Sequence, residues 1–464
     1  MKYHNRRHIL TIILLLVASC APFKPQERQS PEGELPHSFT LYTAESEPEV
    51  RWWEEFNDPD LNMLITEALS DNLTLKEAWS RLVQTRALAV QAGAALYPDL
   101  TGTAEAYYAR QRSENGSRNT ISSEDYSLGV ISSYELDLWG RIRAGRESAL
   151  LEVTAAREDL NTAAMTLAAE VANRWVSIIS QRMQKRLLEH QLQTNLTLLE
   201  LVELRFRMSM VSALDVYQQK QLVEDTRAEI PLVEAEEQVL MHELALLLGK
   251  PPGTSLKISR EDFPEPAEIP ATGLPADLLS SRPDLRRAGM RLKAADWQVA
   301  AARANRLPAI SLTAKAQYGE GDVDALFDNW LLSLAGNLTA PIFDGGRRSA
   351  EVDRRQAIAD ENLSAYRQAV LTAIKEVEDA LVNEVKQREH IRALEDVLGT
   401  ARKALEQAGI RYRNGVTDYL PVLTQLLSVQ GLERNLIRQR ANLLNARISL
   451  YRSLGGTWMD SLSP

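Results

Sequence analysis

The sequence repeats itself at long range. Matching residues stand 210 positions apart in the early part of each half, and farther along the separation becomes 206 and stays constant. The matches include Leu75 with Leu285, Pro98 with Pro308, Gly140-Arg141 with Gly346-Arg347 and Leu248-Gly249 with Leu454-Gly455. A sustained constant offset indicates a tandem duplication of about 200 residues, in which each copy forms one structural unit. The chain is therefore expected to build the same arrangement of elements twice.

Long helices are predicted in each copy. The first copy opens with apolar residues at helical spacing behind the N-cap candidates Asp71 and Asn72, and Pro98 follows as a stop signal. Residues 147–248 then contain no glycine and a single proline. At about 1.5 Å per residue, the part of this stretch before the first break would extend on the order of 90 Å. Breaks at residues 208–213 and 414–419 predict that each long helix turns back as an antiparallel hairpin.

Strands are predicted between the helices. From Ile310 to Tyr318, apolar residues alternate with polar ones, and the segment from Leu332 to Ile342 shows a similar pattern. A period of two with one apolar face is typical of a strand between water and an apolar environment. The first copy has matching segments, so four strands per chain are expected. Because an open sheet edge in hydrocarbon leaves backbone groups unpaired, several chains would have to close one barrel together.

The N-terminal residues have the pattern of a secretory signal. Basic residues precede an apolar run at residues 9–17, which is too short to span a bilayer. The tetrapeptide Val17-Ala18-Ser19-Cys20 contains the only cysteine of the chain and resembles the bacterial lipobox. We therefore predict cleavage before Cys20 and acylation of its sulfur and its new amino group. Ala21, rather than an aspartate, follows the cysteine, which implies sorting to the outer membrane.

A proline-rich stretch with few large apolar residues follows Cys20 and predicts an extended strap. It would connect a lipid anchor to the folded body. The predicted division is a signal peptide at 1–19, a lipid-anchored strap at 20–60, a first repeat at 61–249, a linker at 250–276, a second repeat at 277–455 and a tail at 456–464.

Composition argues against several classes of protein. The net charge is −10, and an acidic chain is a poor partner for nucleic acid. The six histidines show no metal-ligand spacing, and the glycines form no phosphate-binding loop. We therefore expect no enzyme activity, no cofactor and no metal site. With one cysteine no disulfide can form within the chain, so stability must come from packing and oligomerisation.

The chain resembles the outer-membrane efflux family, which is called TolC-like, over nearly its whole length. The segments that carry the resemblance are Tyr134-Glu135-Leu136-Asp137-Leu138-Trp139-Gly140-Arg141, Pro341-Ile342-Phe343-Asp344-Gly345-Gly346-Arg347, Ser281-Arg282-Pro283-Asp284-Leu285 and Leu454-Gly455-Gly456-Thr457-Trp458. The resemblance is to the lipoprotein branch that serves tripartite pumps of the RND type. It implies a mainly α protomer with a membrane β-barrel, in which three chains with four strands each share a twelve-stranded barrel on a long periplasmic α-helical barrel.

The resemblance also implies a cellular setting. A homotrimer would be anchored by lipid in the outer membrane, with a long periplasmic extension. Its partners would be a periplasmic adaptor, a proton-driven inner-membrane pump and outer-membrane lipid. It would passively conduct small molecules such as drugs or metal ions. The alternatives are the exit channel of a type I protein secretion system and a periplasmic coiled-coil scaffold or adaptor.

The resemblance places the functional residues at the two helical hairpin tips. It assigns the periplasmic gate to Asp215, Tyr412, Thr417 and Asp418, and the adaptor contacts to Met208, Ser209, Met210, Val211, Asn414, Gly415 and Val416. An acid near a threefold axis would form a ring of negative charge that narrows the pore and favours cations. The alternative role for Asp215 is a cap on the returning helix, and the exposed methionines could equally be incidental.

The tips depart from the family pattern in two places. Thr417 stands where some relatives have an arginine, and Pro421 replaces a frequent acid, so the full set of inter-helix salt bridges is not expected. Asp418 is the candidate substitute. Gly415 permits a left-handed turn, whereas Ser209 occupies the equivalent place in the first copy, so the second turn is expected to be the sharper.

Acylation of Cys20 can be tested directly. We expect mass spectrometry of the mature protein to show a chain that begins at Cys20 and carries acyl mass, because the lipobox is both a cleavage and a modification signal. An unmodified mature terminus upstream of Cys20 would remove the anchor.

Overall fold

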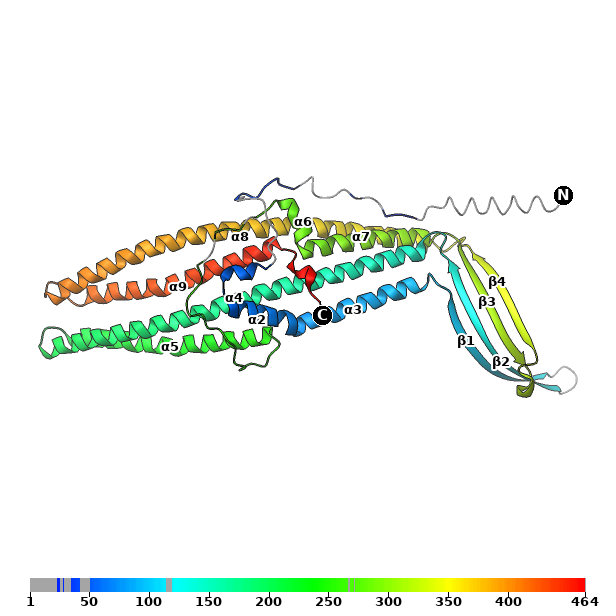
Figure 1. Ribbon diagram of the computed structural model, residues 1–464, viewed down its shortest axis with the longest axis horizontal. Coiled ribbons are helices and arrows are strands. Elements are labelled where there is room, and N and C mark those ends of the chain that lie inside the picture. Colours follow the sequence, from blue (N-terminus) through cyan, green and yellow to red (C-terminus); the bar gives the residue numbers. More distant parts are fainter. Residues whose placement is uncertain are drawn as a thin grey trace. The chain divides into compact units, whose positions relative to one another are not determined.

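The computed structural model describes residues 23–25, 28, 35–41, 51–113, 119–265, 268–270 and 272–463. The signal peptide, Cys20 and much of the strap lie outside these described residues. The chain forms two compact units, each built from both halves of the sequence (Figure 1). Unit 1 comprises residues 1–30, 81–157 and 287–367, and unit 2 comprises 31–80, 158–286 and 368–464.

The two halves contain matching elements in the same order. The first half has α2 (Pro59–Asp71), α3 (Leu73–Ala94), β1 (Asp99–Ser113), β2 (Asn119–Leu136), α4 (Arg141–Arg207) and α5 (Ala213–Leu247). The second has α6 (Leu278–Ser281), α7 (Pro283–Ala304), β3 (Ala309–Glu320), β4 (Trp330–Thr339), α8 (Arg347–Arg413) and α9 (Leu420–Leu454). Helices α4 and α8 have 67 residues each, and α5 and α9 have 35 each. The predicted duplication is confirmed, while the domain boundaries remain a prediction.

At the end of each copy, in unit 2, a glycine lies close to a backbone carbonyl from the start of the same copy. Gly249 and Gly455 follow the second helix of each hairpin, with φ of 69° and 84°. A Cβ atom on Gly249 would lie 2.5 Å from the carbonyl oxygen of Asp71, and one on Gly455 would lie 2.6 Å from that of Ser281. Only glycine tolerates both the left-handed backbone and this close approach. The duplicated glycines are therefore explained by geometry rather than by chance.

The four strands form one antiparallel sheet in the order β1-β2-β3-β4. Register places Val130 opposite Ala316 and Ala316 opposite Leu332, so apolar residues from three strands share a face. The predicted alternation is thus confirmed as one apolar and one polar face. Strands β1 and β4 are the sheet edges, and neither has a second partner strand among the described residues. None of the described helices has an apolar stretch long enough to cross a membrane.

An aromatic cluster in unit 2 joins the residues just before α2 to the C-terminal residues. The rings of Trp52 and Tyr451 stack with centroids 5.4 Å apart, and Trp53 packs edge-on against Trp458 at 4.8 Å. Phe56 meets Trp175 of α4 in the same way at 6.2 Å. Such ring contacts stabilise the fold beyond the effect of burying the apolar area of the rings. Trp52, Trp53 and Phe56, at the end of the predicted strap, are therefore part of the folded core.

A buried ion pair distinguishes the second hairpin from the first. Arg447 of α9 donates two hydrogen bonds to Glu384 of α8, at 2.9 and 2.5 Å, and both residues are almost fully buried. At the 206-residue offset, the positions of this pair in the first hairpin hold Ile178 and Met241. An apolar pair thus fills the same place in the first copy, so the fold does not require charge there.

This comparison predicts how the pair responds to substitution. Glu384→Ile should lower the free energy of unfolding by about 3–5 kcal/mol, because the buried Arg447 guanidinium loses its carboxylate partner. Arg447→Met should lower it by less, since Glu384 keeps a second partner, Arg388, at 3.1 Å. The double variant reproduces the first-copy pair and should recover most of that loss. Thermal unfolding followed by circular dichroism measures all three proteins. A double variant no more stable than the single ones would contradict the equivalence of the two hairpins.

Candidate functional site

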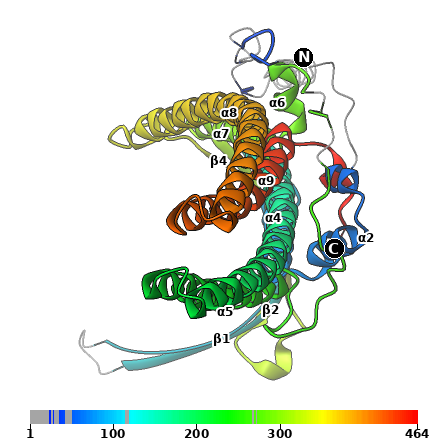
Figure 2. The same ribbon diagram turned by 90° about the vertical axis from the view of Figure 1, so that its left-hand side faces the viewer.

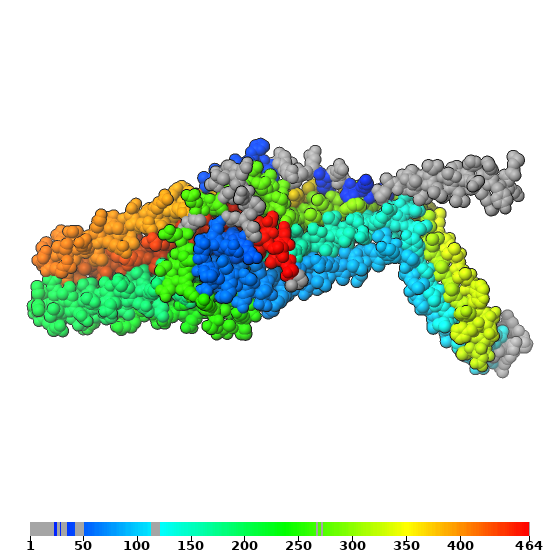
Figure 3. Space-filling model, viewed as in Figure 1, coloured from blue at the N-terminus to red at the C-terminus, as the bar shows by residue number. Residues whose placement is uncertain are grey.

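The two hairpin tips lie together at one end of unit 2 (Figures 2 and 3). Residues 208–212 connect α4 to α5, and residues 414–419 connect α8 to α9. Ser209 and Gly415 are both left-handed, with φ of 59° and 71°. The next amide in each turn donates a 2.9 Å hydrogen bond back into its helix, as in a Schellman motif. The expectation that the second turn is sharper is wrong, because Ser209 adopts the glycine-like conformation despite its side chain.

An apolar cluster joins the two tips. Its buried members come from α4, α5, α8, the second turn and α9, and they are Val202, Val216, Leu222, Tyr412, Tyr419, Val422, Leu423 and Leu426. The rings of Tyr412 and Tyr419 lie 5.5 Å apart within it. Burial of this surface is the main stabilising term of the tip. Any movement of one hairpin against the other must expose part of it.

Arg205 connects the end of α4 to the end of α8. Its guanidinium donates hydrogen bonds to the carbonyl oxygens of Tyr412, at 2.9 Å, and Arg413, at 3.2 Å. These carbonyls belong to the last turn of α8, where intrahelical donors are missing and the helix dipole is negative. The guanidinium also lies 4.4 Å from the centre of the Tyr412 ring, a cation–π contact. No local sequence pattern predicts this role, because the two helix ends that Arg205 connects are about 200 residues apart.

Two of the predicted gate residues each have a buried hydroxyl without a hydrogen-bond partner among the described residues. These residues are Tyr412 and Thr417. Burial raises the pKa of Tyr412, with Asp215 adding to the effect and Arg205 opposing it. An unpaired buried hydroxyl costs about 1–3 kcal/mol. The two buried hydroxyls therefore weaken the packing of the tip rather than stabilise it.

Asp215 occupies a helix cap. Its carboxylate accepts hydrogen bonds from the backbone and the hydroxyl of Ser212, both at 2.9 Å, and its own amide bonds to that hydroxyl. This is a capping box at the start of α5. The cap role that the sequence analysis left open is thus present in the protomer. It does not exclude a further role, because the residue is only half-buried.

The remaining predicted residues form the outer surface of the tips. Met208, Met210 and Val416 expose 59%, 58% and 63% of their surface. Ser209, Asn414, Gly415 and Asp418 are also exposed, and Val211 is half-buried against the apolar cluster. Single exposed apolar side chains are common on protein surfaces, so their exposure by itself does not decide between an adaptor contact and an incidental placement.

A buried polar network runs from the tip along the two hairpins. The Tyr419 hydroxyl donates to Oε1 of Gln219, whose amide donates to the carbonyl of Asn195 at 2.7 Å. Asn195 in turn binds the hydroxyl of Thr226 at 3.0 Å and accepts from Gln430 at 2.8 Å. Burial raises the pKa of the Tyr419 phenol, so it remains a donor. The network therefore joins α4 and α5 to α9, over sequence separations that no local pattern reveals.

Comparison with known proteins gives consistent matches. The family model described as outer membrane efflux protein matches residues 64–250 and 274–456. The pyoverdine export outer membrane protein OpmQ of Pseudomonas aeruginosa is 34% identical over 420 residues, 88% of each chain. The toluene efflux pump outer membrane protein TtgF of Pseudomonas putida is 34% identical over 478 residues, 99% of this chain and 98% of its own.

Solved structures agree with the sequence matches. The outer-membrane channel OprN has a TM-score of 0.87 and 29% identity, covering 94% of this chain and 100% of its own. CusC has a TM-score of 0.84 and 27% identity, covering 93% of this chain and 99% of its own.

The polar network makes a specific prediction for the tip. Tyr419→Phe removes the donor to Gln219 and should destabilise the local structure by about 1–3 kcal/mol, because a buried amide oxygen loses its partner. Hydrogen exchange of the amides in α5 should speed up. Tyr217→Phe is the matched control, since Tyr217 is on the same helix but 69% exposed. Equal rates of amide exchange in the Tyr419 and Tyr217 variants would contradict a stabilising role for the Tyr419–Gln219 hydrogen bond.

Proposed function

The chain belongs to the outer membrane efflux protein family. From this premise we propose that it is the exit duct of a tripartite efflux system. The other two components of that system would be a periplasmic adaptor and a proton-driven inner-membrane pump of the RND type. The protomer belongs in a trimeric outer-membrane channel, in which three four-stranded sheets share one barrel and the long helices form the periplasmic barrel. The duct conducts its cargo passively, and the pump supplies the energy.

The sheet is the observation that carries this proposal. Its apolar face suits lipid, while β1 and β4 each present an open edge. An open edge in hydrocarbon costs several kcal/mol for every unpaired backbone group. Three copies joined edge to edge remove this cost and leave a polar face lining a water-filled path.

The cargo is proposed to be small molecules, such as drugs or metal ions. Relatives with about a third of their residues in common are named for toluene efflux and for pyoverdine export, which differ greatly as compounds. A duct selects little, so the pump would choose among such cargoes. No bond-making step is proposed. Efflux relatives favour this function over protein secretion, and the sheet favours it over a coiled-coil scaffold.

The gate is proposed to lie at the hairpin tips. Arg205 holds the end of α8 against α4, and Asp215, Tyr412, Thr417 and Asp418 would restrain the closed trimer. The exposed tip residues defined above would meet the adaptor. Cys20, once acylated, would anchor the trimer to the outer membrane. The closed state would then depend on contacts weak enough for an adaptor to break.

Single-channel conductance in planar bilayers tests the duct and its gate together. The wild-type trimer should form a pore of low conductance, and Asp215→Ala with Tyr412→Ala should raise its conductance several-fold, because both restraints are lost. Arg205→Ala should act in the same direction. Tyr217→Ala, an exposed substitution beside the tip, should leave conductance unchanged. A protein that forms no pore would overturn the duct, whereas an unchanged pore would leave Asp215 as a cap and make Asp418 the next candidate.

A further inference from the structure

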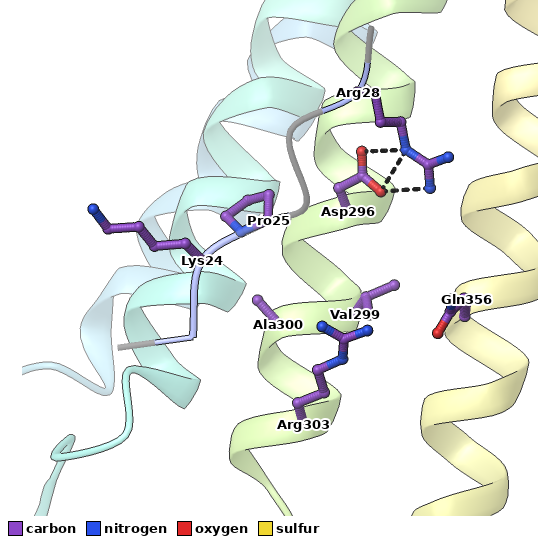
Figure 4. A pocket seen from close by; sticks show the side chains of 8 residues that line it. All are labelled: Lys24, Pro25, Arg28, Asp296, Val299, Ala300, Arg303 and Gln356. Atoms are coloured by element: carbon purple, nitrogen blue, oxygen red, sulfur yellow. Dashed lines mark hydrogen bonds and ion pairs between the residues drawn. The ribbon is translucent and has the colours of Figure 1, made fainter. Parts of the chain in front are cut away.

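A single strap residue is bound to unit 1 by two acids from two helices. The Arg28 guanidinium donates to both oxygens of Asp296 on α7, from Nε at 3.0 and 2.9 Å and from Nη2 at 2.8 Å (Figure 4). Its Nη1 reaches Asp360 on α8 at 3.3 Å. The strap residue is therefore bound at the seam between α7 and α8, 268 positions away from Asp296 in sequence.

The inner part of this contact is shielded from water. The side chain of Arg28 is 20% exposed and that of Asp296 is 9% exposed, whereas Asp360 is 62% exposed. Hydrogen bonds to Asp296 are the largest cause of the raised pKa of Arg28. Bidentate, charge-assisted pairs with little exposure are the strong members of their class, while exposed pairs contribute little. Asp296 is thus the main binding group and Asp360 a secondary one.

The described residues at the start of the strap contact α7 at two levels. Lys24 and Pro25 lie beside Ala300 and Arg303, farther along α7 than Asp296, and all four line the same small hollow (Figure 4). Lys24 and Pro25 therefore lie nearer to β3 along α7 than Arg28 does. Cys20 is four positions before Lys24 in the sequence.

The length of the strap matches the distance that it has to cover. Arg28 is eight positions after Cys20, and these eight steps span at most about 27 Å when fully extended. From Asp296 to the end of α7, eight residues of helix rise about 12 Å, and residues 305–308 lead on to the start of β3. Once Arg28 is bound, Cys20 can reach the start of β3 but not far beyond it. In this family the start of the strand is where the helices give way to the membrane-spanning sheet.

Only one of the two duplicated surfaces can bind the strap in this way. The first-copy counterparts of Asp296 and Asp360, at offsets of 210 and 206, are Arg86 and Thr154. An arginine at the first position would repel Arg28, and a threonine at the second offers no charge. The acids are therefore a feature of the second copy, not a consequence of the fold that both copies share.

We propose that the seam between α7 and α8 is a docking site for the acylated N-terminal segment, with Arg28 as its binding residue. The site sets how far the lipid on Cys20 lies from the body and delivers it to the periplasmic leaflet beside β3. It selects the second copy over the first by charge. This inference rests on the proposed acylation of Cys20.

Cross-linking in outer-membrane vesicles tests the docking. Pro25→Cys and Ala300→Cys place two thiols on the facing segments, and a short bismaleimide should join them in the trimer. Asp296→Asn with Asp360→Asn should lower the yield of the cross-linked peptide about tenfold, because the charge-assisted bonds are lost. Exchanging the charges, with Arg28→Asp and Asp296→Arg, should restore it. The control is Arg354→Ala, which removes an exposed ion pair on α8 and should leave the yield unchanged.

The outcomes separate docking from acylation. The mass of the N-terminal peptide reports acylation of Cys20 in every variant, independently of the cross-link. Acylated protein that does not cross-link, or that cross-links equally without the two acids, would overturn the docking site. Cross-linked protein without acyl mass would instead overturn the anchor while leaving the contact itself in place.

Discussion

Backbone groups at the edge of a sheet cannot remain unpaired in a membrane. This constraint acts on a protomer that has only four strands and therefore two open edges. Closing the barrel requires further copies of the chain, and the trimer of this family follows from that need. The long helices depend on the same assembly, since their broad apolar stripes need neighbours that a single chain does not provide. Assembly is thus a condition of the fold.

Duplication provides a common scaffold, and small differences between the copies give each one its own role. The shared features are geometric: equal helix lengths and glycines that meet a backbone carbonyl in both halves. The differences concern charge. Glu384 and Arg447 replace an apolar pair, and Asp296 stands where the first copy has Arg86. Because the scaffold does not depend on these side chains, they were free to diverge.

The hairpin tips combine strong local structure with weaker contacts between hairpins. Each turn is fixed by its own backbone hydrogen bonds and, in the first tip, by a capping box. Between hairpins, Arg205 and the apolar cluster supply the contacts, and two buried hydroxyls remain without partners in the described protomer. The gate proposed for the tips would need this combination, because the tips would have to move as intact bodies while the contacts between them break.

The sequence by itself determined the elements of this fold. Periods of 3.6 and 2 marked the helices and strands, the offsets revealed the duplication, and the capping role of Asp215 could be foreseen because Ser212 is only three residues away. Tertiary structure alone decided which distant residues meet. Arg205 donates to the last turn of α8, Tyr419 donates to Gln219, and Arg28 donates to Asp296, each across 200 residues or more. The period of 3.6 shows which face of a helix is packed, but it does not show which distant segment packs against that face.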